Sequence, residues 1–189
     1  MRSAEPNRTT AAAALGVLAA FAMPAAHAEE TVCADTLGAV AVDNLRVPAG
    51  ETCTLNATRI KGTLKVERDA TLYARSVRVT GNVQAENAHQ VSVMAGSTVG
   101  GSIQIKQGGA ATIHRAKVTG DIQLESNGGP LSALDNRVGG NLQAFQNRGG
   151  VRLAYNTIAG SLQCKENAPA PSGGDNEARG GKEDQCGGR

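Results

Sequence analysis

The chain has 189 residues, a formal net charge of +2, 24 glycines, two Tyr, two Phe and no Trp. With 2% aromatic residues it cannot build an ordinary aromatic-rich core, so it must bury small aliphatic side chains in a regular lattice or stay disordered. The near-zero net charge argues against nucleic acid or an anionic membrane as a partner, and the length suits one domain.

Residues 1–28 have the pattern of a secretory signal peptide. Arg2 and Arg8 precede an apolar stretch at 11–23, and a small-x-small cleavage pattern ends at Ala28. The stretch is too short for a transmembrane helix, which needs about 20 apolar residues. We expect cleavage after Ala28 and a secreted or periplasmic protein without a membrane span; an N-terminal helix is the alternative.

The predicted domain at 42–164 follows an N-terminal cap at 29–41 and repeats one structural unit along its whole length, with a period of roughly 20 residues. Each unit contains a glycine followed by a small residue, an aliphatic, an outward residue and another aliphatic, as in Gly101-Ser102-Ile103-Gln104-Ile105. The repeated glycines are Gly62, Gly81, Gly101, Gly120, Gly140 and Gly160. Alternation at period two predicts a strand with one buried face.

Two further elements recur in each unit. A second alternating pair comprises Cys53/Leu55, Leu72/Ala74, Val91/Val93, Ala111/Ile113, Leu131/Ala133 and Val151/Leu153. A third buried position comprises Ile60, Val79, Val99, Val118, Val138 and Ile158. Between the first and second strands we expect left-handed corners at Asp69, Asn87, Gly108, Asn127 and Asn147, since Asn and Gly tolerate that conformation.

This self-similarity predicts an all-β, single-stranded parallel β-helix (β-solenoid) of six to seven coils. Twenty residues at roughly 3.3 Å each make a circuit of about 65 Å, or three faces of about 20 Å. The slightly irregular period fits right-handed coils better than left-handed hexapeptide coils, which keep a strict multiple of six. Leucine-rich and helical repeats are excluded because no unit holds ten residues at helical spacing.

Four cysteines in an exported chain predict two disulfides. Cys33 and Cys53 are one coil apart, as are Cys164 and Cys186, and adjacent rungs fit the disulfide range of about 4.4–6.8 Å between Cα atoms. A metal site or redox dithiol fits poorly without a CxxC pair. We expect a Pro/Gly-rich C-terminal cap at 165–189, tied by the second disulfide; a flexible linker is the alternative. Closed ends favour a monomer over a filament.

Three outward columns are candidate surfaces. Lys65 precedes a predicted glutamine ladder of Gln84, Gln104, Gln123, Gln143 and Gln163. The ladder is interpreted as an uncharged, soluble outer surface of the sheet whose stacked amides bond to one another, or as a polar face for a repetitive ligand such as a polysaccharide. A mixed set without register contains Glu67, Glu86, Lys106, Glu125 and Phe145. An interrupted basic stripe contains Arg59, Arg78, Lys117 and Arg137, interpreted as a solvated face or a contact for acidic glycans or lipid headgroups.

The sequence carries no recognisable catalytic constellation. Acidic residues occur singly along the repeat, and His89 and His114 lie in different coils. Glycosidic chemistry needs clustered carboxylates, so no catalytic residue, metal or cofactor is predicted. Asn56 begins a possible N-glycosylation sequon.

The repeated Gly-small-aliphatic-Gln-aliphatic units and the closing Gly160-Ser161-Leu162-Gln163-Cys164 with Cys186 give the chain a family resemblance. It resembles small secreted bacterial β-helix proteins and, more weakly, the polymerising bactofilins. The resemblance implies architecture and no site residues. We expect a non-enzymatic structural or surface-binding module with a polysaccharide or cell-envelope partner. The alternatives are a carbohydrate-active β-helix enzyme and a self-assembling envelope scaffold.

Overall fold

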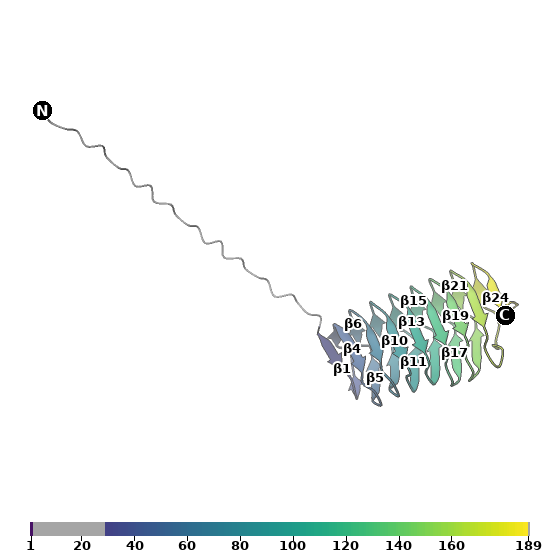
Figure 1. The fold of residues 1–189 in the computed structure, drawn as a ribbon, viewed down its shortest axis with the longest axis horizontal. Coiled ribbons are helices and arrows are strands. Elements are labelled where there is room, and N and C mark those ends of the chain that lie inside the picture. Colours follow the sequence, from purple (N-terminus) through teal and green to yellow (C-terminus); the bar gives the residue numbers. More distant parts are fainter. Residues whose placement is uncertain (2–28, 189) are drawn as a thin grey trace.

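The computed structural model describes Met1 and residues 29–188, so the predicted signal peptide and its cleavage site at Ala28 lie almost wholly outside the described residues. Within them the chain winds into a β-solenoid whose coils stack in sequence order, from purple to yellow in Figure 1. Every regular element in these residues is a short strand. The predicted all-β parallel β-helix is confirmed.

Three parallel sheets form the faces of the solenoid. Sheet A has the order β1 (Glu30–Val32), β4 (Asn44–Val47), β7 (Leu64–Val66), β10 (Val83–Glu86), β13 (Ile103–Lys106), β16 (Ile122–Glu125), β19 (Leu142–Phe145), β22 (Leu162–Lys165), β24 (Lys182–Asp184). Sheet B has β2 (Thr36–Leu37), β5 (Thr52–Asn56), β8 (Thr71–Arg75), β11 (Gln90–Met94), β14 (Ala110–His114), β17 (Leu131–Leu134), β20 (Val151–Ala154). Sheet C has β3 (Ala41–Val42), β6 (Arg59–Ile60), β9 (Arg78–Val79), β12 (Thr98–Val99), β15 (Lys117–Val118), β18 (Arg137–Val138), β21 (Thr157–Ile158), β23 (Glu177–Ala178).

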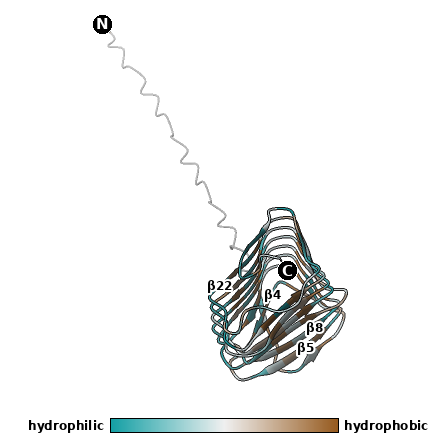
Figure 2. Cartoon of the chain, turned by 90° about the vertical axis from the view of Figure 1, so that its right-hand side faces the viewer, coloured by the Kyte–Doolittle hydropathy of each residue, from teal (hydrophilic) through white to brown (hydrophobic). Residues whose placement is uncertain are grey.

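The interior is a narrow column of small aliphatic side chains. Seen at right angles to Figure 1, the coils lie behind one another and outline a rough triangle (Figure 2). Each aliphatic stacks on its equivalent in the next coil, as Val83 does on Ile103, and every predicted inward position of the three strands is at most 3% exposed. Roughly five such side chains per coil, at about 1.5–3 kcal/mol each, supply the burial that aromatics provide elsewhere.

The repeated glycines lie at the corner between sheets C and A, where successive coils approach each other closely. A Cβ on Gly81 would lie 2.7 Å from the carbonyl oxygen of Gly62, and one on Gly101 would overlap the Asn82 side chain. These glycines do not have positive φ. Close approach between coils therefore accounts for glycine at this corner, and no left-handed turn is needed there.

The predicted corners between sheets A and B are correct for Asp69 and Asn87, which have φ of 59° and 55°. In the next three coils the prediction is wrong by one residue. Gln107, Ser126 and Gln146 take the left-handed conformation instead, with φ between 54° and 58°. The predicted corner residues that follow them, such as Asn127 and Asn147, point inward and are 0% exposed.

These inward asparagines form a hydrogen-bonded ladder of Asn127, Asn147 and Asn167. The Oδ1 atom of Asn147 accepts from the backbone N and the Nδ2 of Asn127, both at 3.0 Å. Its own Nδ2 donates to the Leu124 carbonyl and to Asn167 Oδ1, both at 2.9 Å. Each buried amide thus satisfies backbone groups that the turn would otherwise leave unpaired.

A second ladder, which was not predicted, lies at the corner between sheets B and C. Asn136, Asn156 and Asn176 repeat the same arrangement, with Asn156 Oδ1 accepting from the Asn136 backbone N at 3.0 Å. The recurrence of asparagine at the interval of one coil was the available signal in the sequence. In the described part of the chain no buried side-chain nitrogen or oxygen lacks a hydrogen-bond partner.

Both predicted disulfides are present. Cys33–Cys53 joins Cα atoms 5.6 Å apart and Cys164–Cys186 joins Cα atoms 5.2 Å apart, each between neighbouring coils. Among the described residues there is no free cysteine. The two disulfides therefore link the first and last coils covalently to the coils beside them.

The segments predicted as caps are themselves coils. Residues 29–41 contribute β1 and β2, which pair in parallel with β4 and β5. The C-terminal tail contributes β23 and β24, which pair with β21 and β22, so it neither folds over the end nor forms a linker. The physical reason is that Asn167, Asn176 and Gln185 continue the two polar ladders: Gln185 Oε1 accepts from the Asn167 backbone N at 2.9 Å.

Candidate functional site

The predicted glutamine ladder runs in register along the outside of sheet A. Gln84, Gln104, Gln123, Gln143 and Gln163 occupy equivalent positions in neighbouring strands. Side-chain hydrogen bonds join Gln84 to Gln104 (3.4 Å), Gln104 to Gln123 (3.1 Å) and Gln143 to Gln163 (2.8 Å). The ladder extends into the last coil, where Gln163 donates to Glu183 at 2.9 Å.

These internal hydrogen bonds use only part of each amide. A glutamine amide carries two N–H donors and an oxygen with two lone pairs, and the ladder takes at most one donor and one lone pair from each. The remaining groups face outward from half-buried or exposed side chains. The ladder can therefore stabilise the sheet and still offer hydrogen bonds at a repeat of about 4.8 Å.

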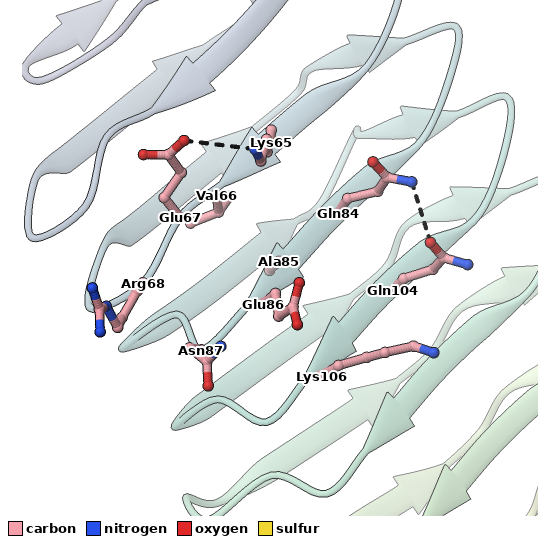
Figure 3. Close-up of a pocket in the computed structure, with 10 residues that line it drawn as sticks. All are labelled: Lys65, Val66, Glu67, Arg68, Gln84, Ala85, Glu86, Asn87, Gln104 and Lys106. Atoms are coloured by element: carbon pink, nitrogen blue, oxygen red, sulfur yellow. Dashed lines mark hydrogen bonds and ion pairs between the residues drawn. The ribbon is translucent and has the colours of Figure 1, made fainter.

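A hollow of about 530 Å³ lies over β7, β10 and β13, at one end of the ladder (Figure 3). Its lining combines apolar surface with polar side chains and carries both signs of charge. The side chains and backbone that line it belong to Lys65, Val66, Glu67, Arg68, Gln84, Ala85, Glu86, Asn87, Gln104 and Lys106. The sequence placed some of these residues in the glutamine ladder and others in the mixed set, but it did not predict that they line one hollow.

Charged neighbours hold one wall of this hollow. Glu67 accepts from the Ala49 backbone N at 3.2 Å and lies 3.6 Å from both Lys65 Nζ and Arg46 Nη1. Arg46 in turn donates to Glu30 at 2.8 Å, and this hydrogen bond raises the pKa of the Arg46 guanidinium. Glu67 is therefore fixed by three contacts, whereas Glu86 has no ion pair within the described residues.

The mixed column on this sheet corrects one prediction. Glu86, Lys106, Glu125, Phe145 and Lys165 lie in register, although this set was expected to lack it. Lys106 and Glu125 form an ion pair at 2.9 Å. The reason is that each of these residues lies five positions after the repeated glycine of its unit, as Glu86 follows Gly81. The next corner absorbs the difference in coil length, since Lys106 pairs with a residue 19 positions on and Ala111 with one 20 positions on.

The described residues show no assembled metal or catalytic cluster. No group of three or more His, Cys, Asp or Glu side chains is placed to hold a metal ion in this part of the chain. His114 Nε2 lies 3.4 Å from Asp135 Oδ2 at the surface, away from His89. Searching residues 29–188 finds no helix long and apolar enough to cross a membrane.

Comparison with protein-family models, with curated proteins and with solved structures gives no match to this chain.

One exposed aromatic lies on a different face. Tyr73, on the outer side of β8, is 43% exposed and lines a hollow of about 350 Å³ on sheet B with Thr54, Arg75 and Ser92. It was not predicted as a surface feature, although Tyr73 stands between the inward residues Leu72 and Ala74. Tyr73 lies on sheet B and not beside the glutamine ladder; the aromatic nearest to the ladder in the sequence is the half-buried Phe145 of β19, which does not line the 530 Å³ hollow.

Proposed function

We propose that this protein is a non-enzymatic, exported binding module that holds an extended polysaccharide along sheet A. One observation carries the proposal: an in-register polar ladder leads into an open hollow of about 530 Å³. Both are built on strands of a stapled solenoid, which keeps the binding groups in place before a ligand arrives.

The chemistry of this surface suits sugar hydroxyl groups. Amide donors and acceptors, two carboxylates and three cations surround the hollow, and a hydroxyl can donate to or accept from any of them as required. A repeating ligand could also meet the same amide on successive rungs. No aromatic side chain lines the hollow itself, which predicts modest affinity for each sugar, offset by the number of rungs in contact.

A binding role is favoured over hydrolysis by the state of the two carboxylates in the hollow. Glycoside hydrolysis uses two carboxyl groups that act on the same bond. Glu67 is committed to Ala49, Lys65 and Arg46, which leaves Glu86 as the carboxylate without an ion pair in this hollow. That both glutamates line one hollow is the observation that supports the enzyme alternative.

Export and a monomeric state belong to the same proposal. Two disulfides are typical of oxidising compartments, which supports a secreted or periplasmic protein. The stapled end coils support a monomer over an envelope scaffold that grows by stacking, and size-exclusion chromatography across protein concentrations separates the two. A cell-envelope polysaccharide is the proposed partner.

A glycan array followed by calorimetry on the oxidised protein tests the proposal. Gln84→Ala with Gln104→Ala should weaken binding at least tenfold, because these amides line the hollow. Gln163→Ala, at the far end of the same ladder, is the matched control and should change the affinity less than threefold. Equal effects of both changes, or no glycan binding at all, contradict the proposal. Release of reducing ends that Glu86→Gln abolishes would favour the enzyme alternative.

A further inference from the structure

Sheet C concentrates positive charge on one flat face of the solenoid. The predicted basic stripe lies in register: Arg59 pairs with Arg78, Thr98 follows, and Lys117 pairs with Arg137. In the sheet C strands β6, β9, β12, β15, β18 and β21, the outward positions and the residues that follow each strand include five cations and no carboxylate; Asp43 and Glu177 lie at the two ends of the sheet. A net charge of +2 for the whole chain therefore conceals a strongly asymmetric distribution.

Of these five cations only Lys61 is neutralised within the described residues, by Asp43 at 2.9 Å. In the described residues Arg59, Arg78, Lys117 and Arg137 form no ion pair, whereas Arg46, Lys65 and Lys106 on sheet A all do. Like charges directly opposite each other on neighbouring strands destabilise a sheet. Stability alone thus disfavours the two adjacent cation pairs on sheet C, and a bound anion would remove this repulsion.

The surface beside the cations is low and open. The neighbouring column holds Thr80, Gly100, Thr119, Gly139 and Ala159, whose backbones continue the hydrogen bonding between coils. One hollow of about 350 Å³ is lined by Lys117, Arg137 and Arg179, and another of about 340 Å³ by Arg115, Lys117, Arg137 and Asp135. Lys117 and Arg137 line both hollows, so an anion between them would meet cations on either side.

We propose that sheet C binds a linear acidic polysaccharide, carrying carboxylate or sulfate groups, laid along the stack of coils. Arg59 and Arg137 are four rungs apart, or about 19 Å, which spans several sugar residues of an extended chain. Thr98 separates two cation pairs, so the chain would be held at two points. This inference is independent of the sheet A proposal, because the two faces share no lining residue.

The residues on this face favour an acidic glycan over other polyanions. Proteins that hold single-stranded nucleic acid stack bases on aromatic side chains, and the outward positions of the described sheet C strands have none. Membrane-surface binding needs exposed apolar side chains beside the cations. Apart from Met1, the exposed large apolar residues of the described chain are Val32, Val40, Tyr73 and Tyr155, which lie outside these outward positions.

Binding of polygalacturonate to the oxidised full-length protein, with dextran as the neutral control, tests the inference. We assume that three to four of the sheet C cations each contact one carboxylate of the polymer. With the dependence of log affinity on log salt that holds for single-stranded nucleic acid, affinity should fall roughly 20- to 50-fold between 50 and 200 mM salt. Lys117→Gln with Arg137→Gln should weaken binding at least tenfold and flatten this salt dependence. Lys165→Gln with Lys182→Gln removes the same charge from sheet A, outside its hollow, and should leave polygalacturonate binding within threefold.

A gain-of-function variant guards against simple misfolding. Thr98→Arg fills the gap between the two cation pairs and should tighten polygalacturonate binding about threefold or more. Equal losses from the sheet C and sheet A charge variants would overturn the inference, as would tighter binding of single-stranded DNA or of vesicles containing anionic phospholipid. Failure of the Gln84→Ala and Gln104→Ala test leaves this result unaffected, so the two proposals fail separately.

Discussion

Replacing Asn147 by Ala tests the idea that buried asparagine ladders hold the corners of this solenoid. Asn147 is 0% exposed, and its Oδ1 atom is the acceptor for two donors of Asn127. A buried donor left without an acceptor costs about 1–3 kcal/mol. Because Asn147→Ala leaves both Asn127 donors without this acceptor, we expect the free energy of unfolding to fall by about 4 kcal/mol.

Urea denaturation followed by circular dichroism, with the disulfides oxidised, measures this change as a shift in midpoint at constant slope. Gln143→Ala is the matched control, since it removes an amide from the outer ladder of the same coil. That change should cost less than about 1 kcal/mol, because water replaces the lost partner. If Asn147→Ala costs no more than Gln143→Ala, the inner ladder does not stabilise the corners and the reasoning fails.

A second substitution at this position separates hydrogen bonding from packing. Asn147→Asp keeps the shape and the accepting oxygen, but it turns a second oxygen toward the Leu124 carbonyl and Asn167 Oδ1. Burial and these facing acceptors will raise the pKa of the new carboxyl. A raised pKa adds stability below the ordinary value of about 4, which is lost as pH rises. Asn147→Asp should therefore be strongly destabilised at pH 7 and recover toward pH 4.

Three further changes test other contacts. Gly149→Ala would place a Cβ against the Gly129 carbonyl and should lower the free energy of unfolding in urea by about 1–3 kcal/mol. In Gly128→Ala the new Cβ has its nearest neighbour 3.9 Å away, so stability should change by less than about 0.5 kcal/mol. Equal costs for the two variants would contradict this. Reducing the Cys164–Cys186 disulfide, which joins residues 22 positions apart, should lower the free energy of unfolding by about 3 kcal/mol. Amide hydrogen exchange should become faster in β24 but not in β13. Equally faster exchange in both strands would argue against a local effect of the disulfide. A hydrogen bond from Lys61 lowers the pKa of Asp43, so Asp43→Asn should lower Tm at pH 7. The difference in Tm between the variant and the unchanged protein should disappear as pH falls below 3.8, the ordinary pKa of an aspartate. A difference that persists in acid would refute the ion pair.

The sequence predicts most of the core because burial in a solenoid is a local property of the chain. Alternation at period two marks Ile103 and Ile105 as inward and Gln104 as outward without knowledge of their partners. The fixed period then places Cys33 beside Cys53, one coil away. The predicted pairing followed from stacking geometry, and the structure confirms it.

The sequence was less informative where the chain leaves its strands. Asn127 was predicted as a left-handed corner, yet Ser126 has φ of 56° and Asn127 points inward. Asparagine suits either role, and the choice depends on whether backbone donors of the neighbouring coil need an acceptor. The same uncertainty led us to expect a cap at 165–189, where Asn167 and Asn176 in fact extend both ladders into a last coil.

By itself, then, the sequence determined the β-solenoid, its inward residues, both disulfides and the outward glutamines, because each follows from spacing along the chain. Only the tertiary structure decided which outward side chains share a hollow and which cations lack a partner. Neighbouring coils differ slightly in length, and corners absorb the difference. The ion pairs and open surfaces depend on side chains meeting across coils, a relation that periodicity alone does not contain.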